Sequence, residues 1–147
     1  MHMMRLQLAL NVRDLDEAID YYSKLFAAEP HKRRPGYANF ALETPPLKLV
    51  LFENPDARER INHLGVEVSM PAELDEAHRR FVEADILDRV DNDRTCCHAT
   101  QDKIWSLEPQ GFSWEWYRIT DDAPEANTSV VASGTDMDDP RDKVCCS

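Results

Sequence analysis

Two short stretches decide the expected fold: residues 6–12 read LQLALNV, and residues 63–68 read HLGVEV. In each stretch apolar side chains alternate with polar or small ones, which is the period of a β-strand with one apolar face. Aligning the two stretches places Gln7 opposite His63 on the less apolar face. The match predicts that the chain contains two copies of one structural unit.

A helical segment is expected after each of these strands. Residues 15–26 and 71–84 both carry apolar side chains at helical spacing, and the tetrapeptide LDEA occurs in both, at 15–18 and 74–77. The second helix is expected to turn inward the side chains of Leu74, Ala77, His78, Phe81 and Val82. The strand and helix matches occur in the same order, which supports an internal duplication.

Further strands complete each unit. They are expected at 37–42, 47–52, about 89–91, 99–107 and 113–119. We therefore expect an α+β fold of two βαβββ modules, at about residues 4–54 and 60–119, inside one domain of residues 1–120. Each module should form a curved sheet with a helix on its outer face and a metal-binding cleft on the inner side. Residues 121–147 are expected to form a flexible acidic tail that ends in Cys145-Cys146.

The composition of the 147-residue chain excludes several classes of function. A net charge of -11 argues against nucleic acids and anionic membranes as partners. No apolar run approaches the ~20 residues of a membrane span, and no signal-peptide pattern opens the chain. The four cysteines form two vicinal pairs, which are poor structural disulfides, so we expect a reducing cytoplasm. A monomer and a homodimer both fit these features.

Gln7, His63 and Glu115 are the candidate metal ligands. Glu115 lies between Trp114 and Trp116, and strand alternation places its carboxylate on the face opposite the tryptophans. If the inner faces of the two modules meet, an amide oxygen, an imidazole and a carboxylate converge. This variant of the two-His-one-carboxylate triad suits Fe(II), with Mn, Co, Ni or Zn as alternatives. Taken one at a time, each of these three residues is more simply interpreted as a polar side chain at the surface.

The vicinal pair Cys96-Cys97 is the candidate site for a soft, thiophilic substrate. It follows residues 91–95, a run rich in turn-forming residues. Adjacent side chains of a strand point to opposite faces, so two neighbouring cysteines can share one ligand only in a bend. Arg94 and Lys103 are candidates for lowering the thiol pKa. Two ordinary loop thiols, or a zinc site that includes His98, remain the alternatives.

Three runs resemble one known family: residues 35–40 (PGYANF), 45–50 (PPLKLV) and 96–103 (CCHATQDK). Together with the module pattern and the three candidate ligands, they are similar to the ArsI-type carbon–arsenic lyases. These belong to the vicinal oxygen chelate superfamily, which includes glyoxalases, bleomycin-resistance proteins and extradiol dioxygenases. The resemblance covers roughly residues 4–118. His98 departs from it, because the family pattern has tyrosine there.

The resemblance implies a non-haem Fe(II) dioxygenase that acts in arsenic detoxification. Such an enzyme uses O2 to cleave the carbon–arsenic bond of trivalent organoarsenicals, such as methylarsenite, and releases arsenite. The resemblance implies that iron is bound by Gln7, His63 and Glu115. It also implies that Cys96 and Cys97 bind arsenic, leaving methyl and aromatic arsenicals both open as substrates.

Lys103 is the candidate catalytic residue, either orienting an anionic oxygen species or pairing with the cysteine loop. Closure of a loop at residues 91–103 is expected to bring the thiols to the metal. One rival function is a glyoxalase-like isomerase or extradiol dioxygenase, which leaves the cysteine pair unexplained. Another is a thiol-based arsenic- or cadmium-binding protein without turnover, in which Cys145-Cys146 is a second capture point. A tail without function is the simpler interpretation of that second pair.

Overall fold

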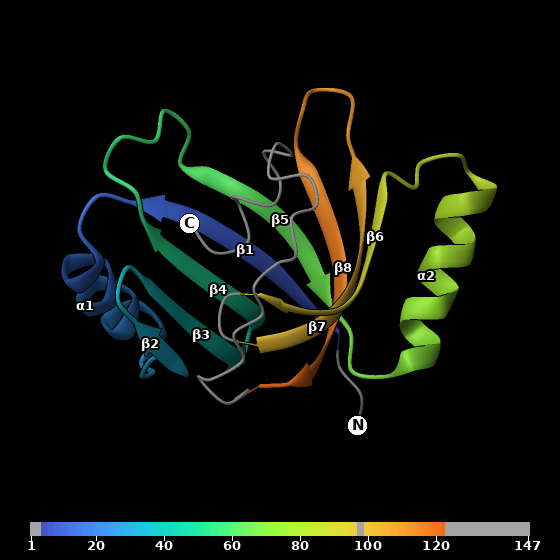
Figure 1. The fold of residues 1–147 in the computed structure, drawn as a ribbon. Coiled ribbons are helices and arrows are strands. Elements are labelled where there is room, and N and C mark those ends of the chain that lie inside the picture. The colour runs from blue at the N-terminus through green and yellow to red at the C-terminus, as the bar shows by residue number, and fades with distance from the viewer. Residues whose placement is uncertain (1–3, 97–98, 123–147) are drawn as a thin grey trace.

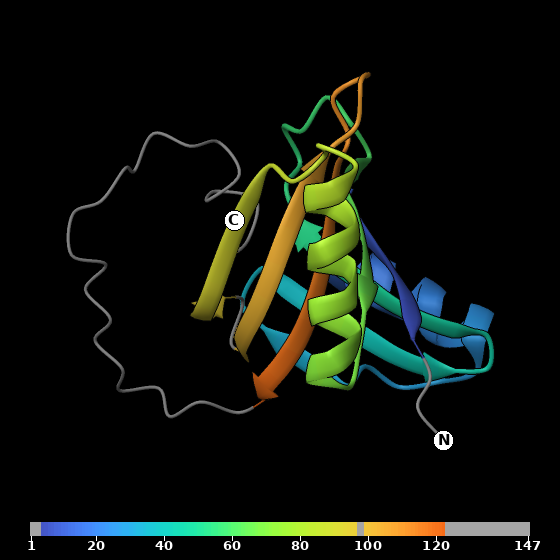
Figure 2. The ribbon, with the colours of Figure 1, turned by 90° about the vertical axis from the view of Figure 1, so that its right-hand side faces the viewer.

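The computed structural model describes residues 4–96 and 99–122, of which 93–96 are described by their backbone alone. Eight strands form one strongly curved sheet, and the two helices lie on its outer side (Figures 1 and 2). The elements are β1 (Arg5–Val12), α1 (Leu15–Phe26), β2 (Lys32–Arg34), β3 (Tyr37–Glu43), β4 (Pro46–Glu53), β5 (Ile61–Glu67), α2 (Pro71–Glu83), β6 (Arg89–Cys96), β7 (Ala99–Leu107) and β8 (Ser113–Asp121). The expected α+β fold of two βαβββ modules is confirmed.

The two strands that showed the repeat lie at the centre of the sheet, whose order is β2-β3-β4-β1-β5-β8-β7-β6. There β1 and β5 pair antiparallel and join the modules. Within each module the last strand lies parallel to the first, β4 beside β1 and β8 beside β5. The inner faces of both modules therefore belong to one continuous concave surface.

The outer face of each module is covered by its own helix. In the first module, Leu15 and Ile19 of α1 pack on Leu49 and Leu51 of β4. Burying each such side chain contributes about 1.5–3 kcal/mol to folding. The apolar side chains of each strand thus pack against a helix. The side chains that alternate with them face the concave side.

The second helix packs through Leu74, Ala77 and Phe81. His78 and Val82, which were expected to face inward, are exposed. The contact with the sheet is a narrow stripe at spacings of three and four residues, so positions at its margin remain in solvent.

Two segments differ from the sequence expectation. Residues 91–95, expected to form a loop, belong to β6, which pairs with β7 and shows a register shift between Asp91 and Arg94. The strand β2 was not expected, because it has only three residues and all are basic. In both cases a neighbouring strand supplies the backbone partners, and this pairing overrides local turn preference. The prediction that residues 91–103 form a loop that closes over the metal is therefore wrong. Cys97 and His98 lie between β6 and β7, and both are outside the described residues.

The end of the last strand reaches slightly further than the expected domain. β8 runs to Asp121, and Asp122 contacts the first module. The remainder of the expected tail, including Cys145-Cys146, lies outside the described residues. Within the described ranges, no helix has the length and apolar character needed to cross a membrane.

Candidate metal centre and substrate cleft

A cavity of about 40 Å³ lies on the concave side of the sheet, with walls from both modules. Gln7 from β1, His63 from β5 and Glu115 from β8 all line it. The structure therefore brings together the three candidate ligands, and all three are buried. They come from the three central strands of the sheet, where the two modules join.

Gly65 explains how two of these side chains can approach one another. Strand register places Gln7 opposite Gly65, and Gly65 opposite Glu115. A Cβ atom at residue 65 would lie 2.7 Å from Gln7 Oε1 and 2.8 Å from Glu115 Cγ, distances that real Cβ contacts do not reach. The glycine thus leaves the space in which the amide and the carboxylate converge.

The imidazole of His63 is fixed on several sides. Its Nε2 lies 3.3 Å from Glu115 Oε1, and its Nδ1 lies 2.9 Å from Asn62 Oδ1. The ring centroid lies 5.7 Å from that of Trp105 and 6.4 Å from that of Phe52. A hydrogen bond at Nδ1 orients the ring and leaves Nε2 directed toward the carboxylate, as in many histidine metal ligands.

Lys103 completes the charge arrangement around Glu115. Its Nζ lies 3.2 Å from Glu115 Oε2, and both side chains are 3% exposed. Burial alone would raise the pKa of Glu115, but Lys103 and His63 outweigh this effect and lower that pKa to about 2. Glu115 is therefore a carboxylate at neutral pH, which is the form that binds a cation.

The donor set fits a divalent metal ion. Gln7 Oε1 is buried and has no hydrogen-bond partner in the part of the chain that the structure describes. An unsatisfied buried acceptor costs about 1–3 kcal/mol, and a cation would satisfy it. No three His, Cys, Asp or Glu side chains converge among the described residues, so a metal bound here requires the amide of Gln7. One amide oxygen, one imidazole and one carboxylate suit the iron-to-zinc series.

The cysteine pair is placed only in part. Cys96 is the last residue of β6 and lies opposite Ala99 in the register of the hairpin. Ala99 is buried and lines the cavity, as do Gln101 and Lys103 further along β7. The backbone at Cys96 therefore pairs with a strand of the cavity wall, whereas Cys97 lies outside the described residues.

Sequence reasoning missed three charged groups of the cavity wall, Lys32, Asp122 and the most buried of them, Lys48. It lies on β4 at the strand parity of the inner face and is 4% exposed. A signal was present: Lys48 interrupts the otherwise apolar run at 47–52. Tyr117, two residues after Glu115 on β8, also lines the cavity.

The Glyoxalase/Bleomycin resistance protein/Dioxygenase superfamily matches residues 5–116, so the chain belongs to this superfamily. Its sequence is 47% identical over 147 residues to the "Cadmium-induced protein CadI" of Mycobacterium tuberculosis, which covers 98% of this chain and 93% of that protein. It is also 47% identical over 141 residues to the "Trivalent organoarsenical cleaving enzyme" of Thermomonospora curvata, covering 95% and 91%. The resemblance that the sequence motifs indicated is confirmed.

Solved structures support the fold. Homoprotocatechuate 2,3-dioxygenase from Arthrobacter globiformis superposes with a TM-score of 0.56 at 20% identity, covering 80% of this chain and 35% of that one. The Mn(II)-bound glyoxalase from Novosphingobium aromaticivorans gives a TM-score of 0.55 at 14% identity, covering 78% and 37%. At these identities the similarity concerns the fold alone.

Proposed function

We propose that this chain is an Fe(II)-dependent dioxygenase that cleaves the carbon–arsenic bond of trivalent organoarsenicals and releases arsenite. One observation carries the proposal: Gln7, His63 and Glu115 converge in a cavity whose wall includes β7, and the first residue of β7, Ala99, pairs with Cys96. The 47% identity to a trivalent organoarsenical cleaving enzyme supports the choice of substrate.

Iron would be held by Gln7 Oε1, His63 Nε2 and the carboxylate of Glu115. When bound, Fe(II) supplies the one-electron chemistry that allows O2 to react with an organic substrate. The overall reaction needs no further reductant: methylarsenite and O2 contain the same atoms as arsenite and formaldehyde. The four electrons accepted by O2 come from the methyl carbon.

The residues of the chain contribute mainly by positioning. The thiolates of Cys96 and Cys97 bind arsenic through two of its three valences, so the third bond, to carbon, is held in one direction. Fixing a reactant in this way accounts for a large part of many enzymatic rates. Lys103 keeps Glu115 ionised and places a positive charge beside the reacting atoms, where it stabilises developing negative charge.

The test is a reconstitution of the purified protein with Fe(II) under anaerobic conditions, followed by O2 and methylarsenite. Arsenite and formaldehyde should appear in equal amounts, and omitting either iron or O2 should abolish both. Cys96→Ser and Cys97→Ser should each lower the rate about 100-fold or more, because arsenic is then held by one bond. A Cys145→Ser, Cys146→Ser double variant serves as the matched control and should retain the rate. Unchanged turnover in the Cys96 or Cys97 variants would contradict the proposal.

A second candidate is thiol-based sequestration without turnover. It is favoured by the relative named as a cadmium-induced protein, which is as similar to this chain as the organoarsenical cleaving enzyme. Sequestration requires neither iron nor O2. Binding of methylarsenite or Cd(II) by the iron-free protein, with no arsenite formed after reconstitution, would favour this function over the first.

A further inference from the structure

Lys48 is a buried cation that the proposed function does not use. It lies on β4 directly opposite Gln7 of β1, one strand away from the proposed metal ligand. Its side chain is 4% exposed and lines the same cavity. A buried lysine is uncommon unless a partner compensates its charge.

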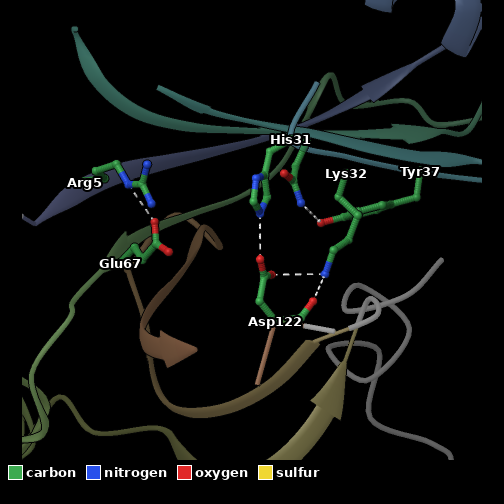
Figure 3. A network of polar contacts seen from close by, with 7 residues as sticks. Arg5, His31, Lys32, Tyr37, Glu67 and Asp122 are labelled. Carbon is green, nitrogen blue, oxygen red and sulfur yellow. Dashed lines mark hydrogen bonds and ion pairs between the residues drawn. The ribbon is translucent and has the colours of Figure 1, made fainter. Parts of the chain in front are cut away.

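The nearby carboxylates are bonded to other groups, as Figure 3 shows. Glu67 accepts from Arg5 Nε at 2.9 Å. Asp122 lies 2.6 Å from His31 Nε2 and 3.1 Å from Lys32 Nζ. Lys48 itself has no hydrogen bond or ion pair within the part of the chain that the structure describes.

Lys48 therefore interacts with the surrounding charged groups only at longer range. The charged groups that act on Lys48 are Glu67 and Asp122 on the acidic side and Arg5 and Lys32 on the basic side. Burial lowers the pKa of Lys48, while Glu67 and Asp122 oppose that effect. Among the described residues, no carboxylate is hydrogen-bonded or ion-paired to Lys48.

A second polar group of the same cavity wall also lacks a partner among the described residues. The hydroxyl of Tyr117 is buried, lines the cavity and makes no hydrogen bond to any described residue. Lys48 comes from β4 and Tyr117 from β8, so donors from both modules face the same space. An ammonium and a phenolic hydroxyl are the donors that a carboxylate accepts from.

We propose that Lys48 and Tyr117 form an anion subsite that binds a carboxylate carried by the arsenic-bound carbon of the substrate. This inference rests on the proposed function. Neighbouring strands are about 4.8 Å apart, so a subsite at Lys48 adjoins Gln7. It therefore also adjoins the arsenic-bound carbon, which the proposed function places beside the metal. The cavity of about 40 Å³ is small and has polar side chains from both modules in its wall, which suits a short acid. The substrate class is a trivalent arsenical with a short acidic substituent, such as carboxymethyl.

The first test compares two substrates of similar shape, one with a carboxylate and one with a neutral amide in its place. Carboxymethylarsenite and its primary amide are given to the iron-loaded enzyme; the acid reacts with O2 to give arsenite and glyoxylate, in balance. The acid should have a kcat/KM about tenfold or more above that of the amide, because charge-assisted hydrogen bonds are stronger than neutral ones. Lys48→Met should reduce this ratio to about one, and Tyr117→Phe should reduce it by a smaller factor. Lys24→Met, an exposed lysine of α1, is the matched control and should keep the ratio.

An acid-to-amide ratio near one in the unmodified enzyme, or a ratio that Lys48→Met leaves unchanged, would overturn the inference. A second measurement does not depend on catalysis. Acetate should raise the melting temperature of the iron-free protein relative to acetamide at equal ionic strength, and Lys48→Met should remove this difference. No acetate effect on the unmodified protein would also overturn the inference.

The two measurements separate the possible failures. Acetate stabilisation without arsenite release under any condition would leave the anion site in place and refute the proposed function. Arsenite release from methylarsenite without acetate stabilisation would refute the subsite and leave the proposed function intact. Acetate stabilisation with an acid-to-amide ratio near one would show that the site takes a separate small anion, and the assignment to the substrate would be wrong.

Discussion

Gly65 faces Gln7 so closely that a Cβ atom at residue 65 would lie 2.7 Å from the amide oxygen Oε1. The same Cβ would lie 2.8 Å from the backbone oxygen of Glu115. Gly65→Ala must therefore displace Gln7 and separate β5 from β8. Because a displaced ligand weakens the site, metal affinity should fall about 10- to 100-fold. Calorimetric titration of the metal-free protein with Mn(II) or anaerobic Fe(II) measures this.

The control for this substitution is Gly111→Ala. Gly111 has a φ of 98° and open space around it, so alanine is strained there without touching the cavity. This variant should lose about 1 kcal/mol of stability or more and keep the metal affinity of the unmodified protein. Equal loss of affinity in both variants would mean that Gly65 acts through general stability.

The buried pair of Lys103 and Glu115 predicts strong coupling in the metal-free protein. Lys103→Met leaves the carboxylate buried without this cation and should lower the free energy of unfolding by about 3–5 kcal/mol. Adding Glu115→Gln should restore most of the loss, because the unpaired charge is then gone. Urea denaturation of the two single variants and the double variant measures the coupling. Additive effects would contradict the pairing.

The burial of Lys48 predicts a pH-dependent gain in stability on its removal. Its pKa is lowered in the folded protein, so the folded state holds this proton more weakly than the unfolded state does. Burying the protonated Lys48 therefore lowers the stability of the folded protein. This loss is fully present below the pKa that Lys48 has in the folded state, and it disappears as pH rises through the ordinary lysine pKa of about 10.4. Without added carboxylic acids, Lys48→Met should exceed the unmodified protein in stability at pH 7, by a margin that shrinks toward pH 10.

Urea denaturation at several pH values between 7 and 10 follows this margin. Lys24→Met provides the reference, because Lys24 is exposed and its substitution should give a small difference that stays constant with pH. A margin for Lys48→Met that is equally constant would show that the charge of Lys48 costs nothing in the folded state.

The contacts of Asp122 predict that the end of β8 stabilises the edge strand β2 of the first module. It follows β8 and contacts His31 and Lys32, the first residue of β2 (Figure 3). Lys32 is 9% exposed. Asp122→Ala removes this partner from a buried ammonium and should cost about 1–3 kcal/mol of stability. Glu29→Ala, at an exposed residue close in sequence to His31, should stay within about 0.5 kcal/mol. Thermal unfolding of both variants measures this difference. Equal stabilities would show that the contacts of Asp122 do not stabilise the fold.

Local sequence patterns could predict which face each candidate ligand occupies. Gln7 and His63 alternate with apolar residues that pack under a helix, so the helices leave both side chains on the opposite, concave face. The same parity argument placed Glu115 opposite Trp114 and Trp116. The duplicated order of strands and helix was sufficient for the two-module fold.

Local patterns failed where a neighbouring strand determined the outcome. Residues 91–96 carry turn-forming side chains but lie in β6, because β7 offers them a backbone to pair with. Lys48 looked like an interruption of an apolar strand, and its isolation became visible only when the partners of Glu67 and Asp122 were known.

The sequence by itself determined the modules, the faces of the strands and the residue types of the candidate site. The tertiary structure decided which of these residues meet: Gln7 with Glu115 across Gly65, and Lys103 with Glu115. It also left Lys48 without a directly bonded carboxylate among the described residues. The reason is physical. Alternation along a strand is a local property, whereas the register between strands far apart in the chain sets the distances between side chains, and that register forms only when the sheet is assembled.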